Sequence, residues 1–136
     1  MKLLLDTHAF IWLNNDVAKL SDRVIEMTQS GQHEFFLSMA SAWEMQIKSQ
    51  LGKLHLSMPV RELIETNINE NHIYLLPITL QDIEQLEKLP THHKDPFDRI
   101  IIAQAMLDDF TIVSIDGVFA DDLARHCSSA VPLKES

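Results

Sequence analysis

Four acidic residues lie where predicted strands end or predicted helices begin. Asp6 and Asp116 each follow an apolar run typical of a buried strand, whereas Glu44 and Asp98 each lie in the first turn of a predicted helix. Carboxylates that meet at one place repel one another and raise one another's pKa unless a cation lies among them. Mg²⁺ and Mn²⁺ bind such oxygen ligands. If the four side chains converge, they form an acidic pocket suited to metal-assisted phosphoryl or phosphodiester chemistry.

Each of these acids also has a local explanation as a capping or turn residue. Asp6 has a side chain preferred at a helix N-cap. Ser41 and Glu44 have the spacing of a capping box, in which the Glu44 carboxylate would accept a hydrogen bond from the Ser41 N–H. Asp116 is followed by a glycine, a pair common in turns. Taken singly, none of these positions distinguishes capping from catalysis.

The segment DPFDR, residues 95–99, opens the most apolar predicted helix and contains two acids. Asp95 and Pro96 have the residue types preferred at the N-cap and at the first helical position. Asp98 would be the third helical residue, where a capping box prefers the longer Glu or Gln. We therefore expect Asp95 to cap the helix and Asp98 to be the functional carboxylate.

The elements that must position these acids alternate between strand and helix. The strands are continuous apolar runs, which is typical of a parallel sheet covered by helices on both faces. The carboxyl ends of such strands share one edge of the sheet, where ligands bind. With no linker-like stretch, we expect residues 1–136 to form one domain. The predicted strands are 3–5, 34–38, 73–78, 111–115 and a last one near 130–133; the predicted helices are a short one at 9–13, then 17–29, 41–50, 59–69, 80–89, 96–107 and 118–125.

Composition and charge limit the class of protein. The 136 residues are 46% hydrophobic, enough for a real core, and the net charge of -9 is opposite to that of a simple basic nucleic-acid binder. The single cysteine allows no internal disulfide, which fits a reducing cytoplasm. No window approaches the roughly 20 apolar residues of a membrane span, and the N-terminal apolar run is too short for a signal peptide. We therefore expect a cytoplasmic protein with no membrane partner.

Four motifs resemble those of the PIN-domain family, and more narrowly the VapC-type toxins of bacterial toxin–antitoxin pairs. The resemblance runs from Lys2 to about Phe119, with the motifs in family order and spacing. It implies a three-layer α/β/α sandwich with a central parallel sheet of four to five strands. It further implies a metal-dependent endoribonuclease that cuts RNA, a cognate antitoxin partner and a homodimer. The motifs are LLLDTHAFIWL, SMASAWEMQIKSQLGKL, HHKDPFDRIIIAQAM and TIVSIDGVF.

The resemblance also assigns roles to the acids. The first three family acids fall on Asp6, Glu44 and Asp98, which would be the catalytic residues and ligands of Mg²⁺ or Mn²⁺. The fourth and most variable family acid falls on Asp116, which would join through water or a second ion. The small hydroxyl residue beside the first acid matches Thr7. On this interpretation the cut RNA carries a 5′-phosphate and a 3′-hydroxyl.

Four residues are candidates for contact with the substrate: Thr7, His8, Lys48 and Arg99. Lys48 has an alternative role, because it lies four residues after Glu44 and could pair with it along the helix. Arg99 adjoins Asp98 and could contact phosphate or simply be a solvated surface cation. We expect both tryptophans to pack in the core, with base stacking by either as the alternative.

Two other functions use the same features. A receiver-like signalling module also combines a parallel sheet with an acidic Mg²⁺ pocket, although it needs adjacent acids after its first strand. Here a single acid, Asp6, follows that strand, and Pro77 lies where an acid should follow the third. A catalytically inactive interaction protein, whose acids only cap helices, is the second alternative.

Overall fold

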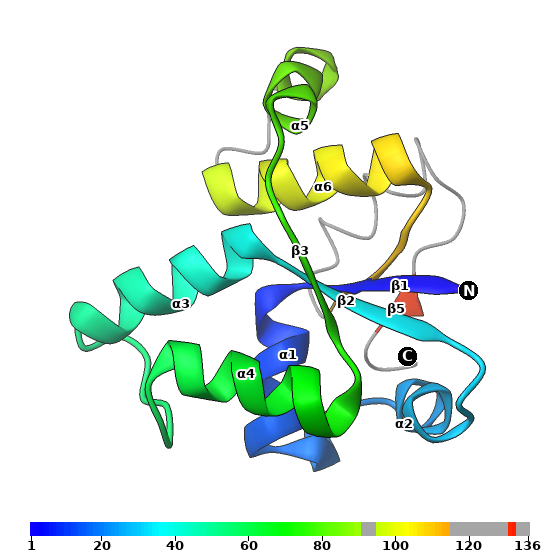
Figure 1. Ribbon diagram of the computed structural model, residues 1–136, viewed down its shortest axis with the longest axis vertical. Helices are drawn as coiled ribbons and strands as arrows, with labels where there is room; N and C mark the ends of the chain where they lie inside the picture. The colour runs from blue at the N-terminus through cyan, green and yellow to red at the C-terminus, as the bar shows by residue number, and fades with distance from the viewer. Residues whose placement is uncertain (91–94, 115–130, 133–136) are drawn as a thin grey trace.

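The computed structural model describes residues 1–90, 95–114 and 131–132 and contains a five-stranded parallel sheet between two layers of helices (Figure 1). The fold class expected from the sequence is therefore confirmed. The strands are β1 (Lys2–Leu5), β2 (Glu34–Ser38), β3 (Tyr74–Leu76), β4 (Thr111–Ser114) and β5 (Val131–Pro132). The helices are α1 (Thr7–Asn15), α2 (Asp22–Gln29), α3 (Met39–Gln50), α4 (Val60–Asn71), α5 (Leu80–Gln85) and α6 (Pro96–Asp108), with 3₁₀ turns η1 (Val17–Lys19) and η2 (Leu86–Lys88).

The apolar run of β1 supplies both hydrophobic cores, because successive side chains of a strand point to opposite faces. Leu3 and Leu5 pack with residues of α1, α2 and α4 on one face. Leu4 packs with residues of α6 on the other face. In Figure 1 these helices lie below and above the sheet respectively, with α5 outside α6. All three leucines are fully buried, which explains why the strand is continuously apolar rather than alternating.

The strands lie in the order β3-β2-β1-β4-β5. Strands β2 and β3 are thus added on one side of β1, and β4 and β5 are added on the other side. Ligands of open α/β sheets bind beyond the carboxyl ends of the strands at such a reversal, which here lies between β1 and β4. Receiver modules have the order 2-1-3-4-5. The receiver-like alternative is therefore wrong on topology.

Several element boundaries differ from the sequence prediction. The single helix expected over 17–29 is wrong, because the chain forms η1, becomes extended at Leu20 and restarts as α2. Ser21 is the N-cap of α2, and its hydroxyl accepts a hydrogen bond from the Val24 N–H at 3.2 Å. The third strand is shorter than expected, and the helix predicted over 80–89 ends as the 3₁₀ turn η2. The helix predicted over 118–125 lies outside the described residues.

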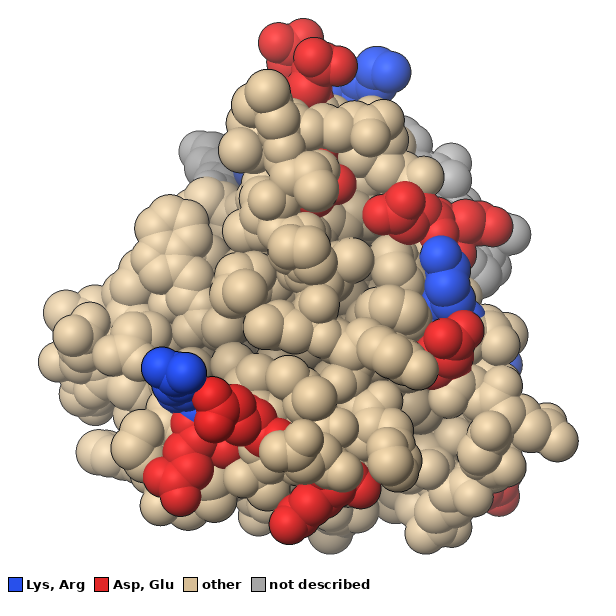
Figure 2. Space-filling view, viewed as in Figure 1, with Lys and Arg blue, Asp and Glu red and all other residues tan. Residues whose placement is uncertain are grey.

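The outer edge of β3 lies toward the viewer in Figure 1, beside α5. Among the described strands, β3 pairs only with β2. In Figure 2, which has the same view, charged side chains lie mainly around the rim of this face and its centre carries few. Tyr74 on β3, with Leu80 and Ile83 on α5, are exposed apolar side chains of these elements. In the described part of the chain, no helix is both long enough and apolar enough to span a bilayer.

Candidate active site

Asp6 connects β1 to α1 and is both a cap and a buried residue. Its carboxylate accepts a hydrogen bond from the Ala9 N–H at 2.7 Å, which confirms its capping role. Its backbone N–H donates to the Val113 carbonyl at 3.1 Å, so the residue lies between the ends of β1 and β4. Only 3% of Asp6 is exposed. Capping therefore does not exclude a functional role, because the same carboxylate lies at the point where the strand order reverses.

Glu44 does not form the capping box expected from the sequence. Helix α3 begins at Met39, two residues earlier than predicted, and its N-cap is Ser38, the last residue of β2, in place of Ser41. The Ser38 hydroxyl accepts from the Ala40 N–H at 3.0 Å. Glu44 therefore lies in the second turn, where a side chain cannot reach back to an N-cap. The capping box of this structure lies instead at the start of α5, between Thr79 and Asp82.

The Glu44 carboxylate is buried and held by two neighbours. The Thr7 hydroxyl, from the first position of α1, donates to Oε1 of Glu44 at 2.6 Å and lies 3.0 Å from the Ser41 hydroxyl. The Lys48 ammonium contacts Oε2 at 2.5 Å, the pairing along the helix that the sequence favours. Glu44 is only 3% exposed. The hydroxyl and the ammonium together fix the orientation of this buried carboxylate.

The pKa of Lys48 records the charges around this pair. Partial burial lowers that pKa, but the hydrogen bond to Glu44 and the negative charges of Glu44, Asp95 and Asp98 together raise it above its ordinary value of 10.5. Lys48 lies on α3, whereas Asp95 and Asp98 belong to the start of α6. Lys48 therefore lies within the negative electrostatic field of acidic side chains from both helices.

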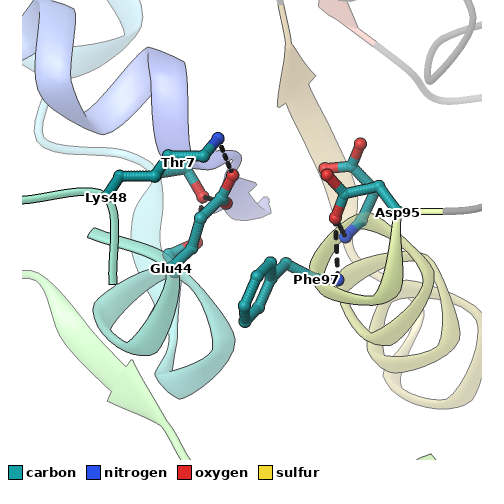
Figure 3. Close-up of polar contacts among 7 residues, drawn as sticks. Thr7, Glu44, Lys48, Asp95 and Phe97 are labelled. Carbon is teal, nitrogen blue, oxygen red and sulfur yellow. Dashed lines mark hydrogen bonds and ion pairs between the residues drawn. The ribbon is translucent and has the colours of Figure 1, made fainter. Parts of the chain in front are cut away.

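The start of α6 faces the Glu44 group across the site (Figure 3). Asp95 is the N-cap: its carboxylate accepts from the Phe97 N–H at 2.9 Å and from the Asp98 N–H at 3.2 Å. Pro96 is the first helical residue and Asp98 the third, as the sequence predicts. The Asp95 side chain is thus engaged with its own helix. Asp98, the third residue of α6, is half-buried.

The structure brings three of the predicted acids, Asp6, Glu44 and Asp98, to one end of the sheet without closing them into one cluster. Within residues 1–90, 95–114 and 131–132, no three His, Cys, Asp or Glu side chains are grouped closely enough to hold a metal ion. Asp116 lies outside the described residues. The donors nevertheless match a hard divalent cation, because they are carboxylate oxygens without thiolate or imidazole partners. Asp6 and Glu44 are both buried, and Thr7, the residue after Asp6, donates its hydrogen bond to Glu44.

The candidate substrate contacts differ in how they are placed. Thr7 is buried and holds Glu44, so its hydroxyl orients a carboxylate. Arg99 donates to the Pro90 carbonyl at 2.8 Å and to the Leu86 carbonyl at 3.1 Å, so its guanidinium ties α6 to the preceding segment. His8 is exposed beside Thr7.

Trp43 is a residue that the sequence prediction placed wrongly. It is 60% exposed rather than packed in the core, and its ring meets that of Phe97 edge to face with centroids 5.2 Å apart. The buried stripe of α3 is formed by Ala40, Ser41, Glu44 and Met45. Position 43 lies beside this stripe, and the residue pattern did not indicate it because the stripe includes the polar residues Ser41 and Glu44. Trp12 is half-buried and packs against the first core cluster.

Comparison with known proteins gives one family and several similar folds. The PIN domain family model matches residues 3–122. No curated protein matches the sequence significantly. Three solved structures have TM-scores well above 0.5 at 12–16% identity, a level that shows a common fold alone. The first is VapBC2 from Rickettsia felis bound to a promoter DNA fragment, with a TM-score of 0.69, 12% identity and 100% of each chain covered. The second is DNA-bound VapBC from Salmonella typhimurium, with a TM-score of 0.65, 14% identity and 96% of each chain covered. The third is a toxin–antitoxin complex from Klebsiella pneumoniae, with a TM-score of 0.63, 16% identity and coverage of 98% of this chain and 99% of that chain.

Proposed function

This chain belongs to the PIN domain family, and we propose that it is a metal-dependent endoribonuclease, the toxin of a type II toxin–antitoxin pair. The observation that carries the proposal is the buried Glu44 carboxylate, fixed by Thr7 beside Asp6 at the reversal of the strand order. Asp6 also caps α1, but Glu44 caps no helix, and a buried carboxylate at that position costs more than an apolar residue would unless it serves a function. We also propose that residues 1–136 form one PIN-like nuclease domain.

In this proposal Asp6, Glu44 and Asp98 hold Mg²⁺ or Mn²⁺, with Asp116 as a fourth acid. The ion, when bound, orients water and offsets negative charge on the scissile phosphate. Thr7 keeps the Glu44 carboxylate directed into the site through its 2.6 Å hydrogen bond. Lys48 neutralises that carboxylate and reduces the repulsion that RNA phosphate would meet from an acidic protein.

The choice of RNA as substrate and of an antitoxin as partner follows from the family and from the similar folds. Two of the similar structures are VapBC assemblies and a third is a toxin–antitoxin complex. We propose that this chain is likewise bound by a cognate antitoxin and works in the cytoplasm. His8, exposed next to Thr7, is the proposed polar contact to the RNA.

We further propose that two copies of the chain pair through the β3 edge. That face is poor in charge at its centre (Figure 2) and carries the exposed side chains of Tyr74, Leu80 and Ile83. An edge strand left unpaired offers its backbone to another chain unless charges protect it. Sedimentation of the Leu80→Asp variant tests this surface, and a monomer is the expected result.

The ribonuclease proposal is tested with a matched pair of variants at the start of α6. Asp98→Asn should abolish cleavage of single-stranded RNA, because it removes a charge from the proposed metal site. Asp95→Asn removes a neighbouring charge but keeps an N-cap side chain, so it should retain most activity. EDTA should abolish wild-type cleavage, and added Mn²⁺ should restore it. A folded Asp98→Asn protein with full activity contradicts the assignment, and cleavage of DNA in preference to RNA contradicts the substrate.

The absence of a three-ligand cluster among the described residues favours a second candidate, a catalytically inactive interaction protein. Calorimetric titration with Mg²⁺ and Mn²⁺ separates the two functions. Binding that disappears in the Asp6→Asn variant supports the nuclease. No heat of binding for either ion supports the inactive protein.

A further inference from the structure

A small apolar pocket lies beside the proposed metal site, between α3 and α6. It has a volume of about 170 Å³. Its lining is apolar apart from Arg99 and consists of Ala40, Trp43, Ile78, Leu86, Pro96, Phe97 and Ile100. Among the described residues that line it there is no carboxylate, although the acids of the site are close in sequence. The pocket is thus a largely apolar hollow at the margin of an acidic centre.

Trp43 and Phe97, which we call the aromatic pair, both line this pocket, one from α3 and one from α6. The two rings are perpendicular, with an interplanar angle of 90°, and they bridge the two helices. Each ring belongs to the residue directly before a proposed metal ligand, since Trp43 precedes Glu44 and Phe97 precedes Asp98. Figure 3 shows the Phe97 ring directed away from Asp95 and toward α3.

Packing among the described residues does not account for the exposure of Trp43. Its indole contacts Phe97 and still leaves 60% of the residue exposed, whereas its helix neighbours Glu44 and Met45 are buried. A large aromatic surface held in place beside a pocket is the arrangement by which proteins stack single-stranded nucleic-acid bases. Stacking also suits this protein's charge of -9, because a neutral base adds no repulsion where phosphate would.

We infer that this pocket receives one base of the RNA, stacked on Trp43, next to the phosphodiester bond that is cut. This inference rests on the proposed ribonuclease function and extends it to a named base-binding subsite. Phe97 fixes the orientation of the indole from the opposite helix. Arg99 donates hydrogen bonds to the Leu86 and Pro90 carbonyls and so holds Leu86, another residue of the pocket lining, in position. The subsite places a base relative to Glu44 and Asp98 and so selects which bond enters the centre.

Steady-state cleavage of a short single-stranded RNA tests the subsite. Loss of stacking on one base is worth about 5- to 150-fold in affinity, from 1–3 kcal/mol at 1.4 kcal/mol per tenfold. Trp43→Ala should therefore raise KM by about that factor with a smaller effect on kcat, and Trp43→Phe should restore most of the loss. Leu51→Ala is the matched control, because Leu51 is a 64% exposed apolar residue at the other end of α3. An unchanged KM in Trp43→Ala overturns the inference while leaving the nuclease proposal intact.

Fluorescence gives a test that does not depend on cleavage. Trp12→Phe leaves Trp43 as the only one of the protein's two tryptophans. In EDTA, a nucleoside 5′-monophosphate should quench this fluorescence, and ribose 5-phosphate, which lacks the base, should not. Equal effects of the two compounds overturn the inference even if no RNA is cleaved. A Trp43→Ala protein that changes its oligomeric state together with KM also overturns it, because the indole would then belong to a protein interface.

Discussion

The hydroxyl of Thr7 should stabilise the folded protein through the buried Glu44 carboxylate. Thr7→Val replaces the hydroxyl by a methyl of similar size, so the shape of the site is kept. Glu44 then loses its 2.6 Å hydrogen bond from α1 and keeps the one from Lys48. The Ser41 hydroxyl, 3.0 Å away, loses a neighbour as well. Thr and Val have similar helix propensities, so the change acts through these contacts.

The size of the effect follows from the charge of the acceptor. A hydrogen bond to a charged group contributes about 1.5–3 kcal/mol, and a neutral one about 1 kcal/mol. We therefore expect Thr7→Val to lower the free energy of unfolding by about 2–4 kcal/mol. For a domain of this size that corresponds to a fall in Tm of roughly 4 °C per kcal/mol.

Urea and thermal unfolding in metal-free buffer measure this loss. Thr7→Ser is the control, because it keeps the hydroxyl and removes one buried methyl, at a cost of about 0.8 kcal/mol. The valine variant should therefore be clearly less stable than the serine variant. A Thr7→Val protein as stable as Thr7→Ser would refute the reasoning. A double-mutant cycle with Glu44→Gln gives a second check, since the two changes should be non-additive if the hydrogen bond matters.

Three further predictions concern local features of the same helices. Asp95→Ala should cost about 1 kcal/mol in urea unfolding through loss of the α6 cap, whereas Asp95→Asn should cost far less. Gly52→Ala should cost about 1–2 kcal/mol, because Gly52 has a φ of +74° and no atom lies near enough to clash, so the whole cost is backbone strain. The pKa of Lys48 is raised in the folded protein, so the folded state holds this proton more tightly than the unfolded chain does. The contribution of the Lys48–Glu44 pair to the free energy of unfolding should therefore be full below pH 10.5 and disappear as pH rises through the raised pKa. Unfolding curves of metal-free wild type and Lys48→Met should converge only as pH rises above 10.5, and a constant difference between them there would contradict this.

Features that depend on a few neighbouring residues could be read from the sequence. The Asp95 cap and Pro96 at the first position of α6 were predicted, because a helix N-terminus is determined within one turn. The pairing of Lys48 with Glu44 is equally local, as it joins residues four apart on one helix. The parallel, two-sided sheet also follows from the sequence, because its strands are continuous apolar runs.

The start of α3 shows where local reasoning fails. Ser38 and Ser41 are both good N-cap residues, and the second has a glutamate three positions later. The choice between them depends on where β2 ends, and β2 continues to Ser38 because that residue pairs with Leu76 of β3. Long-range strand pairing therefore sets the helix start. Successive residues of a helix lie about 100° apart around its axis, so the packing that buries Glu44 leaves Trp43 exposed beside it.

The sequence by itself determined which residues carry charge and which elements form, since caps, turns and apolar periodicity act over a few residues. The tertiary structure alone decided which of these residues meet. Thr7 and Glu44 are 37 residues apart, and only the parallel pairing of β1 with β2 brings α1 and α3 together at one end of the sheet. The physical reason is that such a contact depends on the packing of whole layers of secondary structure. The free energy of that packing is spread over both hydrophobic cores, so no short stretch of sequence predicts it.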